Sequence, residues 1–225
     1  MVPIGPVQTE MILSIELRTY SFIDSLQPQV ASFVETVARG FLPLEGQAAM
    51  FIEVSPGMSI ERVTDVVLKN TSAIPGMQVV ERAFGMLEVH HEDQGMVQAA
   101  GQAALEHYGL VEKDRLKPRV VSSQVVTGMD NHHTALINRM RHGNMIFKGQ
   151  TMYILEVHPA GYAAIAANEA EKAADIEVLE VITFGAFGRM WLGGNEEEIN
   201  QAKLRVEAVL ADMDGRANEG TTTSF

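Results

Sequence analysis

The stretch GQAAMFIEVSP at residues 46–56 has a near copy later in the chain, GQTMYILEVHP at residues 149–159. The offset between the two stretches is 103 residues. Without gaps, the same offset aligns further identical residues: Gly40 with Gly143, Lys69 with Lys172, Ala83-Phe84-Gly85 with Ala186-Phe187-Gly188, and Gln98-Ala99 with Gln201-Ala202. A constant offset over so many identical residues is not expected by chance. The chain is therefore predicted to contain two copies of one unit.

The repeat sets the expected domain boundaries. The first copy is predicted at residues 11–110 and the second at residues 117–213. The charged segment VEKDRLKP, residues 111–118, is the natural linker, because Pro118 discourages a helix from running through it. The small, polar end of the chain, residues 214–225, is expected to be a flexible tail.

Composition excludes several classes of function. The net charge of −12 provides no basic stripe for nucleic acid or for an anionic membrane surface. The absence of cysteine excludes disulfides, thiolate catalysis and cysteine-ligated metals, and it fits a reducing cytoplasm. The chain shows no secretory signal, and no apolar run approaches the roughly 20 residues of a membrane helix. We therefore expect a globular cytoplasmic protein.

Each copy is predicted to be α+β. In the second copy the pattern indicates, in order, a strand at 119–126, a helix at 131–143 with Gly143 as its C-cap, a strand at 151–157, a helix at 160–175, two strands joined at 184–187, and a helix at 195–213 with Asn195 as its N-cap. The first copy repeats this order, with helices near 27–39, 59–72 and 94–108. Strands and helices that alternate in this way, with two strands joined by a short connection, favour an antiparallel-rich sheet with helices covering one face.

The second copy contains, in order, the segments ILEV, EKAAD, FGAFG and WLGGN. In these segments it resembles the bacterial microcompartment shell domain, which has a strand, a helix end, a pore loop and a glycine-led turn at the matching places. In the ordinary domain of that family, one strand and one helix come last in the chain. Here the matching strand and helix come first, as in the circularly permuted members of the family, which have ferredoxin-like sheets. The phrases IELRTYSFIDSLQPQ, VVERAFGMLEVH and KDRLKPRVVSSQVV are similar to the carboxysome-type tandem shell proteins with a gated pore.

The resemblance implies a structural protein that is neither an enzyme nor dependent on a cofactor. Members of that group form homotrimers, each of which mimics a hexagonal tile of six domains. Tiles pack with other hexameric and pentameric shell proteins around a cytoplasmic compartment, and small metabolites pass through a pore on the symmetry axis. Some members stack two trimers face to face.

The resemblance also identifies candidate pore residues. They are Glu81, Arg82 and Ala83 in the first copy, and Phe184, Gly185 and Ala186 in the second, with the Glu-Arg pair as the gate. A threefold axis would gather three arginines that repel one another, and the neighbouring glutamates would compensate their charge. Taken alone, however, a Glu-Arg pair between strands is typical of a solvated turn.

Two lysines are candidate contacts at the edge of the tile. Lys69 and Lys172 each end a predicted helix, and the resemblance implies that the matching lysine lies between neighbouring tiles. The alternative is a favourable positive charge at a helix C-terminus.

Two other functions stay open from the residues alone. A trimer of compact α+β domains could be a metabolite-sensing, ligand-binding protein, and His90 or His133 could serve a lyase or isomerase. The run His90-His91-Glu92-Asp93 contains metal-ligand residue types, but neighbouring residues point in different directions and give poor ligand geometry. We therefore predict no metal site and no catalytic residues.

Overall fold

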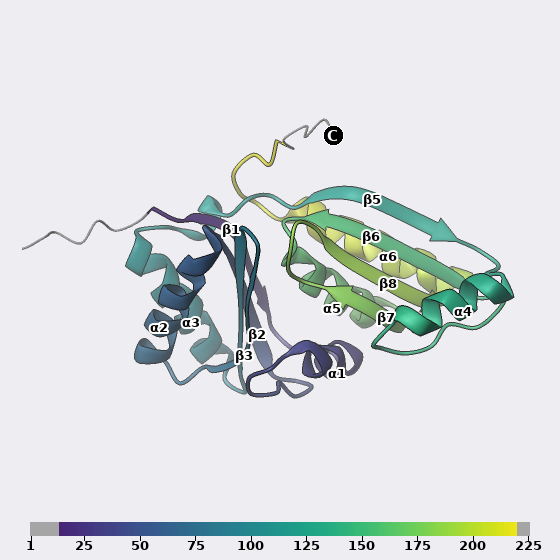
Figure 1. The fold of residues 1–225 in the computed structure, drawn as a ribbon, viewed down its shortest axis with the longest axis horizontal. Helices are drawn as coiled ribbons and strands as arrows, with labels where there is room; N and C mark the ends of the chain where they lie inside the picture. Colours follow the sequence, from purple (N-terminus) through teal and green to yellow (C-terminus); the bar gives the residue numbers. More distant parts are fainter. Residues whose placement is uncertain (1–13, 220–225) are drawn as a thin grey trace, which may run out of the picture.

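The computed structural model describes residues 14–219 as two similar units joined by a short linker (Figure 1). The first repeat contains β1 (Glu16–Ile23), α1 (Pro28–Val37), β2 (Ala48–Ser55), η1 (Gly57–Ser59), α2 (Ile60–Asn70), β3 (Ile74–Glu81), β4 (Phe84–His91) and α3 (Gln94–Tyr108). Residues 11–13, at the predicted start of this unit, lie outside the described residues.

The second repeat has the same order of elements. It contains β5 (Arg119–Val126), α4 (Asn131–Met140), β6 (Thr151–His158), α5 (Tyr162–Ala173), β7 (Glu177–Ile182), β8 (Gly188–Gly194) and α6 (Glu196–Asp212). A 3-10 turn, η2 (Glu112–Asp114), lies in the linker. The prediction of a two-unit α+β chain is confirmed.

Each repeat is built on a four-stranded antiparallel sheet. The strand orders are β1-β2-β4-β3 and β5-β6-β8-β7, so the two sheets are connected alike. The quoted stretch at 46–56 forms β2, an inner strand with both faces buried: Ile52 enters the core under α2 and α3, and Phe51 enters a core shared with the second repeat. A continuous apolar run is what such a strand needs.

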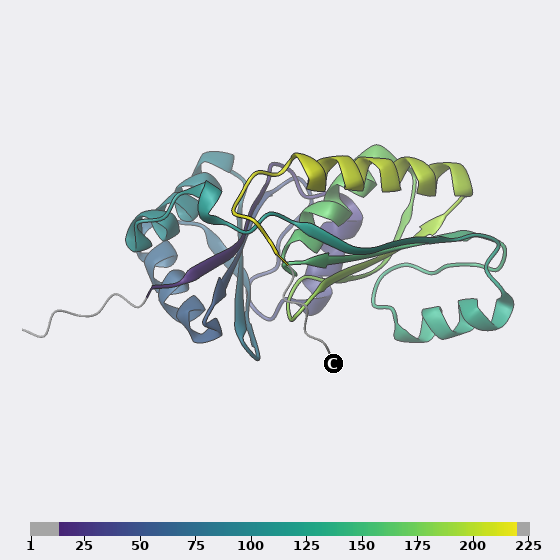
Figure 2. The ribbon, with the colours of Figure 1, turned by 90° about the horizontal axis from the view of Figure 1, so that it is seen from above.

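The helices of the second repeat lie on both sides of its sheet. Figure 2 shows α5 and α6 on one side and α4 on the other. Asn195 occupies the predicted N-cap of α6, although its side chain makes no capping hydrogen bond. Among the described helices, none has the length and apolar composition to cross a membrane.

The prediction that Gly143 caps α4 is wrong. The helix ends at Met140 with Arg141 as its C-cap. The N–H of Gly143 instead donates to the carbonyl of Leu179 (2.9 Å), and a Cβ at Gly143 would lie 2.3 Å from the carbonyl oxygen of Val178. Glycine is required there because the chain passes close against β7, which helical periodicity does not reveal.

Helix α1 lies between the two repeats (Figure 1). It shares a core with Phe51 of its own sheet, and its Phe33 is 3% exposed in the part of that core that includes residues of β7 and α5. Its N-terminus is capped across the junction, where the carboxylate of Glu171 accepts hydrogen bonds from the backbone N–H groups of Gln29 (2.8 Å) and Val30 (3.0 Å). A carboxylate there satisfies free N–H groups and complements the helix dipole.

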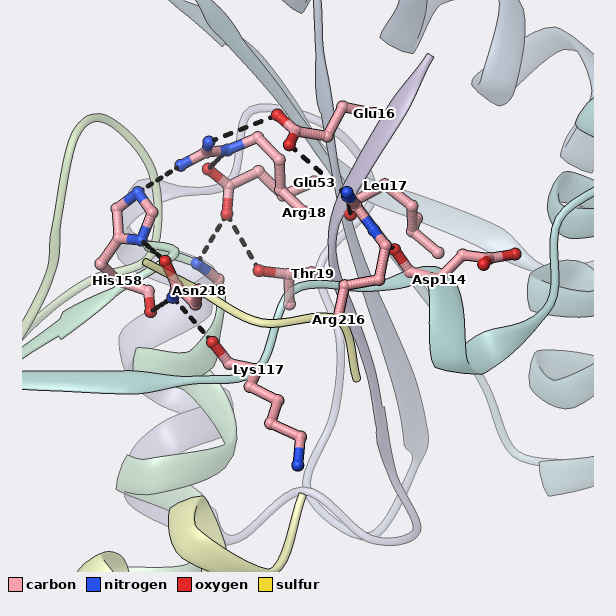
Figure 3. Close-up of polar contacts among 11 residues, drawn as sticks. Glu16, Leu17, Arg18, Thr19, Glu53, Asp114, Lys117, His158, Arg216 and Asn218 are labelled. Carbon is pink, nitrogen blue, oxygen red and sulfur yellow. Dashed lines mark hydrogen bonds and ion pairs between the residues drawn. The ribbon is translucent and has the colours of Figure 1, made fainter. Parts of the chain in front are cut away.

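A buried polar network also joins the two repeats (Figure 3). The carboxylate of Glu53 accepts hydrogen bonds from Arg18 Nε (3.1 Å), Thr19 Oγ1 (2.9 Å) and the backbone N–H of Gly161 (3.2 Å). A second nitrogen of Arg18 lies 3.0 Å from Nε2 of His158. Glu53, Arg18 and Thr19 belong to the first repeat, and Gly161 and His158 belong to the second, so the network fixes the relative position of the two repeats.

The start of the predicted flexible tail is held by hydrogen bonds. Arg216 donates from Nε to the carbonyl of Asp114 (2.6 Å), and its own carbonyl accepts from the N–H of Lys117 (2.9 Å). Asn218 Oδ1 lies 3.0 Å from Nδ1 of His158. Residues 214–219 therefore close over the linker, whereas residues 220–225 lie outside the described residues.

His158, at the junction between the repeats, should make the stability of the protein depend on pH. Burial, and secondly the neighbouring Arg18, hold the pKa of His158 below its ordinary value. As the pH falls below about 6.5, the unfolded chain binds a proton at this position before the folded chain does, so stability is lost as the pH falls through the folded pKa. We expect His158→Gln, which is neutral at every pH, to lose less free energy of unfolding between about pH 7 and pH 5.

Urea denaturation of both proteins at the two pH values measures this difference. An equal loss in the His158→Gln variant and in the unsubstituted protein would contradict a contribution from His158.

Candidate functional site: two hairpin turns

The predicted pore residues lie at the turns of two matching hairpins. Glu81 ends β3, and Arg82 and Ala83 form the turn before β4. The turn between β7 and β8 contains Phe184 and Gly185, together with the exposed Ala186. The offset that relates the repeats therefore relates two structurally equivalent turns.

The fold brings these two turns together. A Cβ built on Gly185 would lie 3.6 Å from Cγ of Glu81, although the two residues belong to different sheets. Phe184 is half-buried and packs against the core that the repeats share. The charged turn of one repeat thus lies directly beside the uncharged turn of the other.

The backbone is left-handed at the same position of both turns. Gly185 has φ 98° and Arg82, its counterpart in the offset, has φ 54°. Glycine adopts such angles without strain, whereas a residue with a Cβ loses roughly 1–2 kcal/mol. Among the described residues, Arg82 is the one non-glycine with positive φ. An arginine is therefore held at a position where glycine would be more stable.

The charges of the first turn are loosely held. Arg82 Nε lies 3.7 Å from Oε1 of Glu81, and the two side chains are 93% and 47% exposed. An ion pair this open to water contributes about 0–1 kcal/mol. The side chain of Arg82 can therefore leave Glu81 for another partner at little cost in free energy.

The strands next to the two turns are held by close backbone contacts. A Cβ at Gly85 would lie 2.2 Å from the carbonyl oxygen of Gly57, and a Cβ at Gly188 would lie 2.3 Å from that of Ala160. These contacts are equivalent under the repeat offset, which explains why both glycines match in sequence. Each hairpin therefore has a rigid base that carries an exposed turn.

Arg18 connects the first hairpin to the junction between the repeats. Its guanidinium carbon lies 3.5 Å from the ring centroid of Phe84, the first residue of β4. The same guanidinium binds Glu53 and contacts His158. The position of the charged turn is therefore coupled to the packing of the second repeat on the first.

The two candidate edge lysines differ in their surroundings. Lys69 is 72% exposed at the end of α2 and pairs with Asp65 of the same helix (2.7 Å). The side chain of Lys172 is 27% exposed, and its ammonium pairs with Asp24 of the first repeat and with Glu169 (3.1 Å). Lys172 thus joins the two repeats within the chain, whereas Lys69 is open to a neighbour.

The candidate catalytic histidines lie on different repeats. His90 is 1% exposed on β4, where Nδ1 lies 3.1 Å from the buried carboxylate of Glu88, whose pKa is raised by burial. His133 is exposed on α4. Among residues 14–219, no group of three or more histidine, aspartate or glutamate side chains is arranged to hold a metal ion.

The strain at Arg82 was not predicted, but the sequence contained a signal for it. In the repeat alignment Arg82 faces Gly185, and a glycine at one of two equivalent turns indicates that the other turn needs a positive φ. Comparing the copies position by position would have identified the strained residue.

Comparison with known proteins finds relatives over most of the chain. Residues 17–114 match the family model described as the CsoS1D N-terminal domain. The chain is 50% identical over 208 residues to the carboxysome shell protein CcmP of Synechococcus elongatus, covering 92% of this chain and 98% of that protein. It is 48% identical over 204 residues to the carboxysome shell protein CsoS1D of Hydrogenovibrio crunogenus, covering 90% and 100%.

Two solved structures share the fold over nearly the whole chain. The fused permuted hexameric shell protein MSM0275 from the RMM microcompartment is similar at a TM-score of 0.87 and 44% identity, covering 89% of this chain and 99% of that chain. The double-ringed trimeric shell protein MSM0271 from the same microcompartment is similar at a TM-score of 0.88 and 37% identity, covering 91% and 100%.

The backbone strain at Arg82 can be measured directly. Arg82→Ala and Arg82→Gly both remove the guanidinium, but only glycine accepts the left-handed backbone freely. We expect the free energy of unfolding of Arg82→Gly to exceed that of Arg82→Ala by about 1 kcal/mol in chemical denaturation. As a matched control, Ala83→Gly at the next turn position gives no such gain, because φ is not positive there. Equal stabilities of the two Arg82 variants would exclude the strain.

Proposed function

Because this chain belongs to the family of carboxysome-type tandem, circularly permuted microcompartment shell proteins, we propose that three copies form a pseudohexameric tile with a gated central pore. The role of the chain is structural, and its relatives are shell proteins and not enzymes. The pore is lined by the two hairpin turns, and the gate is the pair Glu81 and Arg82.

The observation that carries the proposal is the meeting of the two turns within one chain. Gly185 approaches Glu81 although each turn belongs to its own sheet. Three chains around a threefold axis would then present six turns in alternation, three charged and three small. The small turns let the backbone come close to the axis, and the charged turns determine what passes.

The proposed gate follows from the charges of the first turn. In the closed state, Arg82 of one chain pairs with Glu81 of a neighbouring chain, so that alternating charges fill the axis. In the open state the arginines line the channel and favour anionic metabolites that carry phosphate or carboxylate groups. The weak pairing and the strained backbone at Arg82 support two arrangements of similar free energy.

The remaining parts of the proposal concern assembly. Tiles join other hexameric and pentameric shell proteins at their edges, where Lys69 is exposed at the end of α2. Pairs of trimers stack face to face, as supported by the similarity to a protein described as a double-ringed trimer. Metabolites reach the lumen through the paired pores.

Substitutions in the gate should change passage in opposite directions. Glu81→Gln leaves three uncompensated arginines on the axis, so we expect faster passage of anions. Arg82→Gln leaves three carboxylates, so we expect slower passage of anions. The measurement is the entry rate of a phosphorylated metabolite into shells assembled with each variant around an enzyme that consumes it.

The control is Arg205→Gln, which removes an exposed arginine from α6 that pairs with Glu169. It should leave the entry rate unchanged. If both gate variants alter entry in the same direction, or neither alters it, the gate assignment is wrong even where trimers form.

The lysines give a second test. Lys69→Ala should reduce the assembly of tiles into sheets, seen by electron microscopy, with trimers retained. Lys172→Ala removes the bond to Asp24 and should lower the thermal stability of the chain instead. Unchanged sheets for Lys69→Ala would count against its place at the tile edge.

A further inference from the structure

One contact across the junction connects the two hairpin turns within the chain. Phe84 directly follows the charged turn, and its counterpart in the offset, Phe187, directly follows the uncharged turn. The guanidinium carbon of Arg18 lies 3.5 Å from the ring centroid of Phe84. The imidazole of His158 meets the ring of Phe187 edge-on, with 6.0 Å between the ring centroids. Because Arg18 and His158 also contact each other (3.0 Å), this pair forms a bridge between the two turns.

The hydrogen-bond partners of His158 determine where its ring carries a proton (Figure 3). A guanidinium can only donate, so Nε2 must accept from Nη2 of Arg18 and is itself unprotonated. Nδ1 faces Oδ1 of Asn218 (3.0 Å), because the amide nitrogen of Asn218 already donates to the carbonyls of Lys117 (2.7 Å) and His158 (2.9 Å). The ring therefore has one proton, on Nδ1, and the bridge requires neutral His158.

A proton on Nε2 would turn the attraction in the bridge into repulsion. Of the charged groups that face the imidazole, Arg18 on β1 and Arg119 on β5 oppose its protonation, and Glu16 on β1 favours it. Glu53 on β2 is already bound to Nε of Arg18 (3.1 Å), and the tail faces the ring with an uncharged amide. Burial, and secondly Arg18, hold the pKa of His158 below its ordinary value, so the bridge is intact at neutral pH.

We propose that His158 is a proton-operated switch that connects the two turns when neutral and releases the charged turn when protonated. On protonation, Nε2 no longer accepts from Arg18. The guanidinium then keeps its bond to Glu53 and moves toward Glu16, whose carboxylate lies 3.9 Å from Nη1. Phe84 loses the cation that packs on its ring. The switch acts within one chain, and its effect on passage rests on the proposed pore.

The bridge occurs once in the chain and is not repeated by the offset. Arg18 corresponds to Val121 and His158 corresponds to Ser55, and neither counterpart gains or loses a proton near neutral pH. Divergence of the two repeats has therefore placed the switch at the junction within the chain. It acts through Phe84 on the turn that carries the charges.

Fluorine NMR of the full-length protein can follow the two ends of the bridge separately. A single 4-fluorophenylalanine is placed at position 187, beside the imidazole, or at position 84, beside Arg18. The resonance at position 187 reports the protonation of His158 directly. We expect the resonance at position 84 to change with the same midpoint, below the ordinary histidine value of about 6.5.

Two substitutions of histidine by glutamine test the origin of this change. His158→Gln should keep the resonance at position 84 constant between about pH 8 and about pH 5, because an amide oxygen can accept from Arg18 and does not ionise. The matched control is His142→Gln, which removes another histidine of the second repeat that pairs with a carboxylate, that of Glu180 (2.9 Å). It should leave the titration at position 84 unchanged.

Three results in the NMR experiment would overturn the switch. The first is a resonance at position 84 that stays constant while the one at position 187 titrates. The second is a pair of resonances that both stay constant, and the third is an equal titration at position 84 in His158→Gln. The first two are read from labelled protein with His158 in place, so they do not depend on the folding of a histidine variant.

Passage into shells separates the switch from the proposed pore. The entry rate of a small radiolabelled sulfonate, which stays anionic in this range, is measured for shells with the unsubstituted protein and with His158→Gln. We expect the ratio of the two rates to rise severalfold from about pH 7.5 to about pH 5.5, because the released turn leaves the axis more often.

The combined outcomes tell the two proposals apart. A titration at position 84 with no change in the ratio of entry rates would leave the switch standing and overturn the gate. A constant resonance at position 84, together with opposite effects of Glu81→Gln and Arg82→Gln on entry, would overturn the switch and leave the gate standing.

Discussion

The arrangement of the whole molecule depends on one buried carboxylate, that of Glu53. Burial raises its pKa, and Arg18, Gly161 and Thr19 supply the hydrogen bonds that let it stay in the interior. Removing one partner of such a buried pair costs about 3–5 kcal/mol, so the donors are strongly fixed in place. Because they come from both repeats, this network sets how one sheet lies against the other. Through the contact of Arg18 with Phe84, it also sets where the charged turn points.

Duplication supplies two equivalent turns, and divergence makes them chemically different. The tight contacts at Gly85 and Gly188 are the same in both repeats, so the hairpins share a geometry that glycine makes possible. Beyond these glycines, one turn carries Glu81 and Arg82, and the other carries the uncharged residues 184–186. The left-handed backbone costs little free energy at Gly185 but is strained at Arg82. The strain is therefore confined to the turn that carries the charges.

Much of the fold could be predicted because its signals are local. A fixed offset revealed the repeat, and periodicity placed the helix at 94–108 and the strand at 119–126 where the structure has them. The contacts between repeats could not be predicted in this way. Periodicity shows which residues of α1 are buried, but not that a sheet far along the chain buries them. The close approach at Gly143 is likewise set by tertiary contact, and only the match to Gly40 in the other copy hinted at it.

The two kinds of contact around the proposed ring differ for a physical reason. The junction within the chain forms without loss of translational freedom, so it can include a buried polar network whose net contribution to stability is small. A contact between separate chains must first overcome the entropy of association, which burial of apolar surface offsets. The same division applies to the pore that we propose. Six identical domains would place six arginines around its axis, whereas the fused pair would place three, each with an uncharged turn beside it. Fewer like charges lower the repulsion in a narrow channel, and a closed arrangement of glutamate with arginine becomes attainable.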